Sequence, residues 1–101
     1  MKTYWLNYGF DVFDPDKTTW NDVAGIYIFA AITPDYKWKA IYIGQAQSFK
    51  DRLTNHENWD SAVRLGASHI HAMVVPLAAN RDSIEAQLIA YYQPPLNVQL
   101  R

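Results

Sequence analysis

The apolar run Gly-Ile-Tyr-Ile-Phe-Ala-Ala-Ile at residues 25–32 constrains the fold more than any other feature of this sequence. It is rich in β-branched and aromatic residues, and Thr33-Pro34-Asp35 follows it with the composition of a turn. A second β-rich segment, Lys39 to Gly44, comes after the turn. The pattern predicts two strands, at 25–32 and 39–44, that form one hairpin.

The period of two along a strand assigns side chains to the two faces of this hairpin. The first strand is expected to divide into Tyr27, Phe29 and Ala31 on one face, and Ile26, Ile28 and Ile32 on the other. In the second strand, Tyr42 alternates with Ile41 and Ile43 in the same way. If the isoleucines face the core, Tyr27 and Tyr42 project together from a partly open sheet face. There they form either a cross-strand packing pair or a site for a polar ligand.

The order of the other segments predicts a small α+β domain. Residues 1–24 are rich in aromatic residues and turn formers, which indicates an N-terminal arm packed on a domain formed by residues 25–101. Capping residues and prolines set the remaining boundaries. The expected elements are helix 48–56 with Ser48 as cap, helix 58–65 with Asn58 as cap and Gly66 at its end, strand 68–75 ended by Pro76, and helix 81–92 with Asn80 as cap and Pro94-Pro95 beyond it.

Composition favours a single soluble domain in a reducing compartment. The chain has 101 residues, of which 50% are hydrophobic, and it contains no cysteine. Disulfides, thiolate metal sites and cysteine nucleophiles are therefore excluded. We find no apolar run of membrane-spanning length and no signal peptide, so we expect a cytoplasmic protein without a membrane partner.

The formal net charge of −1 is low for a nucleic-acid-binding protein. Residues 1–24 hold two basic against four acidic residues, whereas residues 25–101 hold seven basic against six acidic ones. No basic tail or stripe stands out. If the chain acts on nucleic acid, its unaided affinity should be modest.

Arg52 and His56 are the first candidates for chemistry. They are four residues apart in the helix expected at 48–56, so they should lie on one helical face. That face also carries the apolar pair Phe49 and Leu53. Without other information, Arg52 reaching solvent and His56 capping the helix end explain the pattern well.

Glu85 lies in the helix expected at 81–92, which is apolar nearly all round and therefore expected to be largely buried. A carboxylate at the border of a buried surface is costly unless it is paired or holds a metal. A salt bridge to Arg52 or Arg81 is the structural alternative.

Other polar residues have simpler interpretations. Asn97 follows the rigid segment Pro94-Pro95-Leu96 and is the kind of residue that often bonds nearby backbone. His69 and His71 alternate on the strand expected at 68–75, with no carboxylate at matching spacing. We expect these two to be surface or half-buried histidines.

In combination, these residues closely resemble the GIY-YIG nuclease family. The matching elements, in chain order, are Gly25-Ile26-Tyr27, Tyr42-Ile43-Gly44, Arg52 eight residues later, Glu85, and Asn97 twelve residues after that. The resemblance covers residues 25–97. It implies a three-stranded antiparallel sheet flanked by helices, and cleavage of DNA phosphodiester bonds with a single divalent cation, Mg²⁺ or Mn²⁺.

The resemblance also implies a role for each matched residue. Glu85 resembles the single protein ligand of the metal, and Tyr27 resembles the general base that takes a proton from the attacking water. Tyr42 resembles the tyrosine that orients the water or contacts phosphate. Arg52 resembles the arginine that steadies negative charge on the phosphate, and His56 matches a histidine that assists the tyrosine in some members. The residues expected to support the site structurally are Gly25, Gly44 and Asn97.

We therefore expect a metal-dependent endonuclease that hydrolyses DNA, with duplex and branched substrates both open. Its recruitment to DNA would depend on the site itself, on the aromatic arm, on a homodimer or on a targeting partner protein. The alternative is a non-catalytic module of the same fold that binds nucleic acid or a protein. A third hypothesis, an interaction domain with chance motif similarity, requires Tyr27, Tyr42, Arg52 and Glu85 to be dispersed in space.

Overall fold

The computed structural model describes residues 1–99, so residues 100–101 of the segment expected at 25–101 lie outside the described part. It has a five-stranded sheet with helices on both faces, and the strand order is β1-β2-β5-β3-β4. In chain order the elements are β1 (Lys2–Trp5), β2 (Tyr8–Phe13), a 3-10 helix (Pro15–Lys17), β3 (Gly25–Ile32), β4 (Trp38–Ala46), α1 (Phe49–Leu53), α2 (Trp59–Arg64), β5 (Ala67–Val74), α3 (Ala78–Tyr92) and α4 (Pro95–Gln99).

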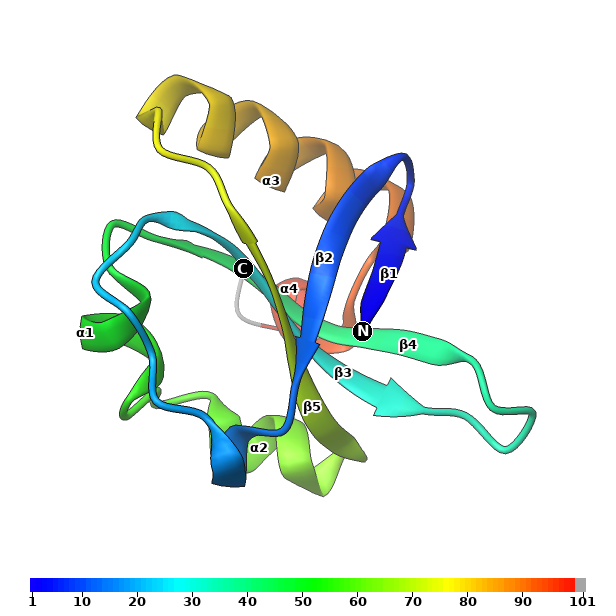
Figure 1. Ribbon diagram of the computed structural model, residues 1–101. Helices are drawn as coiled ribbons and strands as arrows, with labels where there is room; N and C mark the ends of the chain where they lie inside the picture. Colours follow the sequence, from blue (N-terminus) through cyan, green and yellow to red (C-terminus); the bar gives the residue numbers. More distant parts are fainter. Residues whose placement is uncertain (100–101) are drawn as a thin grey trace.

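The strand β3 is an interior strand, because it pairs antiparallel with β4 on one edge and with β5 on the other. One face of the sheet packs against α3, which contributes Leu88 to a core containing Ile26 and Ile28. The opposite face packs against the other helices, which contribute Phe49, Leu53, Ala62 and Leu96 to a second core. Helices lie on both faces of the sheet (Figure 1), and the side chains of β3 are buried on both faces up to Ala31.

The sheet has five strands and not three, because residues 1–24 form β1 and β2. The strand β2 pairs antiparallel with the edge of β5, where Val12 lies opposite His71. The sequence does not reveal this hairpin because its turn has an unusual residue at the left-handed position. Leu6 has a φ of 53°, where a glycine or asparagine would normally mark a two-residue turn.

The sheet face that carries Tyr27 is closed, which corrects the expectation of a partly open face. Tyr27 is 1% exposed and belongs to the core that contains Phe49 and Leu53. Tyr42, half-buried, packs against the same core, so the prediction that the two tyrosines share a face is confirmed.

A β-bulge changes the expected alternation of the isoleucines. Phe29 pairs with Tyr42 and Ala30 pairs with Ala40, so Ile41 is an extra residue in β4. Ile41 therefore joins the core on the Tyr27 side, away from Ile43 on the other side. Ile32, expected to face the core, is exposed at the end of β3.

The two short helices follow the predicted capping pattern in part. The helix α1 is shorter than the expected 48–56, and the Ser48 hydroxyl accepts a hydrogen bond from the Asp51 N–H at 3.2 Å as predicted. The helix α2 is followed by Gly66 with a φ of 102°, but Asn58 makes no side-chain capping bond.

The helix α3 begins three residues earlier than expected, with Leu77 and not Asn80 at its N-cap position. Alanines at 78 and 79 favour helix, and the Arg81 N–H closes the first turn on the Leu77 carbonyl at 3.0 Å. Of the residues of α3, only Arg81 and Leu88 are buried, so the expectation of a largely buried helix is wrong. No helix within residues 1–99 has the length and apolar character needed to cross a membrane.

The helix α4 is not predicted from the sequence. It begins at Pro95, within the Pro94-Pro95 pair that was expected only to end the preceding helix. The left-handed Gln93, with a φ of 48°, ends α3. Pro95 then occupies the first turn of α4, where a missing N–H costs no helical hydrogen bond.

Gly25 allows β3 to approach two neighbours at once. A Cβ built on Gly25 would lie 2.1 Å from the Met73 carbonyl oxygen and 2.5 Å from Cζ of Phe49. Because the nearest of these atoms belongs to the backbone of β5, no rotamer change can make room. The start of β3 therefore has no space for a side chain.

Replacing Gly25 by alanine should lower the free energy of unfolding by roughly 2 kcal/mol or more, because the strand must move to accept the methyl group. Urea unfolding followed by tryptophan fluorescence measures this loss. Gly9→Ala is the matched control, since its Cβ would meet only the flexible side chains of Tyr4 and Lys2, at 3.2 and 3.3 Å. Equal losses in the two variants would contradict the packing argument.

His71 is fully buried, which corrects its expected surface or half-buried position. The Trp5 Nε1–H donates to its Nδ1 at 2.9 Å, so the neutral ring carries its proton on Nε2. That Nε2 has no hydrogen-bond partner within the described residues. Burial, with a smaller contribution from His69, lowers the pKa of His71 to about 4.

Stability should fall on acidification partly because of His71. Its pKa is about 4 when folded and 6.5 when unfolded, so between these values the unfolded state binds more protons. The contribution is fully present above pH 6.5 and lost towards pH 4, on the order of 3 kcal/mol in total. His71→Gln keeps an acceptor for Trp5 but does not titrate. Unfolding curves at pH 7 and pH 4.5 should therefore show a smaller difference for this variant, and an unchanged difference would argue against the buried neutral histidine.

Candidate active site

The phenol of Tyr27 lies over Gly44 on the neighbouring strand. Tyr27 pairs with Gly44 in the β3–β4 register. A Cβ on Gly44 would lie 2.4 Å from the phenolic oxygen and 2.5 Å from Cζ of Tyr27. Gly44, in the segment Tyr42-Ile43-Gly44, therefore provides the space that the phenol of Tyr27 occupies.

His56 donates a hydrogen bond to the phenolic oxygen of Tyr27. The Asn58 backbone N–H donates to His56 Nδ1 at 3.0 Å, so Nδ1 is an acceptor and the proton of the neutral ring is on Nε2. His56 Nε2 lies 2.7 Å from the Tyr27 oxygen. Burial, and then the charge of Arg52, lowers the pKa of His56 to about 4. His56 is therefore a neutral donor at pH 7, and the phenol O–H of Tyr27 can be directed to another group.

Burial is the largest influence on the acidity of Tyr27. It raises the pKa of the phenol, and the neighbouring Tyr42 raises it further, whereas the positive charge of Arg52 lowers it. Tyr27 is therefore a weaker acid than a free tyrosine, and its phenolate needs additional positive charge nearby.

Tyr42 extends the aromatic cluster towards the surface. Its ring centroid lies 6.2 Å from that of Tyr27 and 5.5 Å from that of His56. Its ring is half-buried, in contrast to the ring of Tyr27. The phenol of Tyr42 is thus the more accessible of the two.

Arg52 is held by Glu57, a residue that the sequence pattern does not single out. Arg52 Nη1 donates to Glu57 Oε2 at 2.6 Å, and Nη2 donates to Oε1 at 3.0 Å. This hydrogen-bonded pair raises the pKa of Arg52 and lowers the pKa of Glu57 to about 2. We expected His56 on the same helical face as Arg52. Since α1 ends at Leu53, His56 lies instead in the connection that follows the helix. A guanidinium fork that donates to two carboxylate oxygens could also donate to two phosphate oxygens.

Glu85 reaches the site from α3, and its partner is an amide and not an arginine. Gln45 Nε2 donates to Glu85 Oε1 at 3.1 Å. The ion pairs among residues 1–99 do not include Glu85, so the salt bridge to Arg52 or Arg81 is not formed. Burial raises the pKa of Glu85, and the charge of Asp82 raises it further, whereas the Gln45 hydrogen bond lowers it.

Asn97 binds backbone, but in a strand that is distant in sequence. Its Oδ1 accepts from the Ile43 N–H and its Nδ2 donates to the Ile43 carbonyl oxygen, both at 2.8 Å. Ile43 lies between Tyr42 and Gly44. Asn97 therefore fixes the part of β4 that carries Tyr42-Ile43-Gly44.

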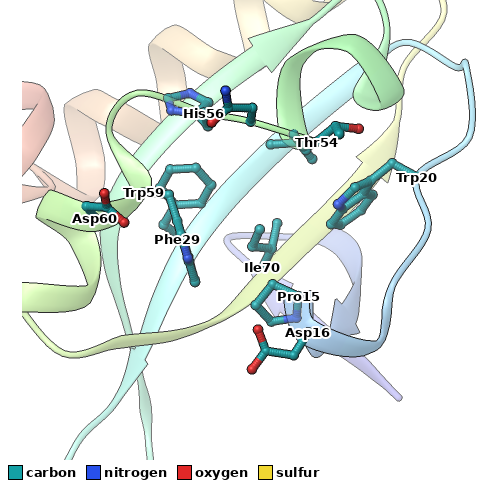
Figure 2. A pocket seen from close by; sticks show the side chains of 11 residues that line it. Pro15, Asp16, Trp20, Phe29, Thr54, His56, Trp59, Asp60 and Ile70 are labelled. Atoms are coloured by element: carbon teal, nitrogen blue, oxygen red, sulfur yellow. The ribbon is translucent and has the colours of Figure 1, made fainter.

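Two hollows adjoin these residues. The cleft in Figure 2 lies beside His56, with Trp20 and Trp59 on opposite sides and the carboxylates of Asp16 and Asp60 around it. These negative charges oppose the approach of a phosphate. A second hollow at the end of β4 is lined by Gln45 and Arg52 among others. It offers a phosphodiester a cationic partner.

The structure brings the candidate residues together. Tyr27, Tyr42 and His56 are in contact, and the charges of Arg52 and Glu85 both act on Tyr27. The dispersed arrangement required by chance similarity is not observed.

The donor groups fit a hard divalent cation bound mainly by water. Within residues 1–99, no group of three or more His, Asp or Glu side chains is placed to hold a metal. Mg²⁺ is commonly bound by one or two carboxylates and keeps several waters. Glu85 supplies a half-buried carboxylate with no cationic side chain on it, and such a group suits this mode of binding.

Sequence comparison finds two curated relatives, both called UvrABC system protein C, whereas no protein-family model matches the chain. The one from Methanothermobacter thermautotrophicus is 30% identical over 93 residues, which is 87% of this chain and 15% of the relative. The one from Dictyoglomus thermophilum is 32% identical over 81 residues, or 76% of this chain and 13% of the relative. The chain thus spans a small part of the length of these proteins.

Solved structures with the same fold come from Thermotoga maritima. The GIY-YIG N-terminal endonuclease domain of UvrC, bound to its catalytic magnesium, superposes with a TM-score of 0.60 at 26% identity, over 75% of this chain and 84% of that one. A point mutant of that domain, bound to its catalytic divalent cation, gives a TM-score of 0.62 at 26% identity, over 75% and 83% of the two chains. Motifs, fold and relatives agree, and the chain is a GIY-YIG domain similar to the N-terminal endonuclease domain of UvrC.

Proposed function

We propose that this domain is an endonuclease that hydrolyses DNA phosphodiester bonds with one divalent cation. The observation that carries the proposal is the buried Tyr27 phenol, which accepts a hydrogen bond from neutral His56 at 2.7 Å beside Tyr42. The similar UvrC domains are described as endonucleases with a catalytic divalent cation, which supports the same reaction class.

In the proposed reaction, the phenolate of Tyr27 takes a proton from a water molecule whose oxygen forms a bond to phosphorus. The bond from phosphorus to the leaving oxygen breaks, and that oxygen takes a proton from solvent. His56 favours the phenolate by donating its Nε2–H to it. Glu85 would hold the divalent cation, which when bound would supply positive charge to offset the burial of Tyr27 and to stabilise the charge on the phosphate.

Arg52 would hold the phosphate once Glu57 has moved away. Its guanidinium presents two N–H groups to two oxygens of Glu57, and this geometry matches two phosphate oxygens. Tyr42, the more accessible phenol, would contact the phosphate or orient the water. Gly25, Gly44 and Asn97 would act through the position of the two strands.

The alternative, a non-catalytic module, is favoured by two features. Arg52 is already paired with a carboxylate, and the chain as a whole carries a net charge of −1. Both features weaken attraction to DNA. Recruitment by a homodimer or a targeting partner would compensate for this under the proposed function.

Cleavage should depend on Arg52 and Glu85. With Mg²⁺, Arg52→Ala and Glu85→Ala should each lower the rate of supercoiled-plasmid nicking by about 100-fold or more, since each removes a charge placed on the reacting phosphate or its cation. Arg64→Ala, which removes an exposed arginine of α2, is the matched control and should keep the wild-type rate. If wild-type protein freed of contaminating nucleases cleaves neither duplex, branched nor single-stranded DNA with Mg²⁺ or Mn²⁺, the proposed function fails.

Glu57→Gln should lower KM for DNA severalfold with little change in kcat, because it frees the Arg52 fork without touching the reacting groups. Steady-state cleavage at several DNA concentrations measures both constants. Asp60→Asn removes an exposed carboxylate that has no bond to Arg52, and it serves as the control for charge alone. Equal changes in KM for the two variants would show that the Arg52–Glu57 pair does not compete with phosphate.

A further inference from the structure

The amide of Gln45 joins two carboxylates of α3. Its Nε2 donates to Asp82 Oδ1 at 2.8 Å and to Glu85 Oε1 at 3.1 Å. Asp82 and Glu85 are three residues apart, so they lie on the same face of the helix. One nitrogen therefore holds two carboxylate oxygens close together.

The orientation of this amide is fixed by a buried arginine. Arg81, which is 5% exposed, donates from Nε to Gln45 Oε1 at 3.4 Å. Its Nη1 donates to the carbonyl oxygens of Val75 and Pro76 at 3.0 and 2.8 Å. Because the oxygen of the amide faces Arg81, its nitrogen must face the two carboxylates.

No cationic side chain neutralises the carboxylate pair within residues 1–99. The ion pairs there involve other acids, and Arg81 directs its N–H groups to carbonyl oxygens and to Gln45. Two like charges on a partly buried helix face repel each other, and a neutral amide compensates this only in part.

We propose that Asp82 is a second carboxylate of the divalent-cation site, acting beside Glu85, and that Gln45 holds both carboxylates in position for the cation. The inference rests on the proposed function, which assigns the cation to Glu85, and it adds a second carboxylate to the single acidic ligand that the resemblance implies. Direct contact with Asp82 and contact through a water would both suit Mg²⁺, which is bound in both ways in proteins.

The test measures cation binding without DNA and without turnover. Isothermal titration with Mg²⁺ and with Mn²⁺, and the rise of Tm with either ion, report binding to the whole chain. Glu85→Gln should abolish binding. Asp82→Asn should weaken it by about 10-fold or more, the size of effect known for groups that support metal ligands, and Asp82→Glu should recover part of the loss.

Asp51→Asn is the matched control for the loss of a nearby negative charge. Asp51 lines the same hollow as Gln45, but it does not bond to the Gln45 amide. Its variant should bind Mg²⁺ within about threefold of the wild type, since exposed charges act weakly through water. Asp82 is exposed, so Asp82→Asn is expected to fold, and its unfolding curve in the absence of metal checks this.

The outcomes separate the two proposals. If wild-type protein binds neither Mg²⁺ nor Mn²⁺, the proposed function loses its cation and this inference falls with it. If wild-type protein binds and Glu85→Gln does not, while Asp82→Asn binds as tightly as Asp51→Asn, the cation site stands and the role of Asp82 is overturned. A loss specific to Asp82→Asn, partly restored in Asp82→Glu, supports the second carboxylate.

Discussion

The structure depends on how closely other segments approach β3. At Gly25 the backbone of β5 and the ring of Phe49 occupy the space of a side chain, and at Gly44 the phenol of Tyr27 does so. The second of these contacts permits Tyr27 to be buried against the sheet. That burial then raises the pKa of the phenol, so a packing constraint sets the chemistry of the group.

In the absence of a ligand, the ionisable groups of the site are held in unreactive states by burial or by pairing. Tyr27 and Glu85 both have raised pKa values because they are buried, and Arg52 is occupied by Glu57. Positive charge near Glu85 would favour the ionised form of both acids, and a phosphate would compete with Glu57 for Arg52. Without such ligands, each group is held in its less reactive state.

Local patterns in the sequence predict much of this fold. The strand at 25–32 matches β3 at both ends, and the capping bond of Ser48 is present. The hairpin of β1 and β2 is not predictable in the same way, because its turn depends on Leu6 adopting a positive φ. Such a conformation is stabilised by the tertiary pairing of β2 with β5, not by local preference.

The motif positions locate the tyrosines, Arg52 and Glu85, but not the groups that hold them. No recognisable spacing in the sequence marks Glu57 or Gln45. The contact of Glu57 arises in the connection after α1, and that of Gln45 arises where β4 crosses α3. The bond from His56 to Tyr27 likewise depends on α1 ending at Leu53. Sequence patterns record which side chains are present, whereas their protonation depends on partners that only the folded chain supplies.

Asn97 has a further consequence for the surface of the sheet. The strand β4 is an edge strand, and edge strands expose N–H and C=O groups to which another chain can add. The Asn97 amide occupies both of these groups at Ile43. An incoming strand cannot extend the sheet across the middle of β4 without displacing it. Growth of the sheet by strand addition is therefore directed to β1, at the opposite edge and away from Tyr27 and Tyr42.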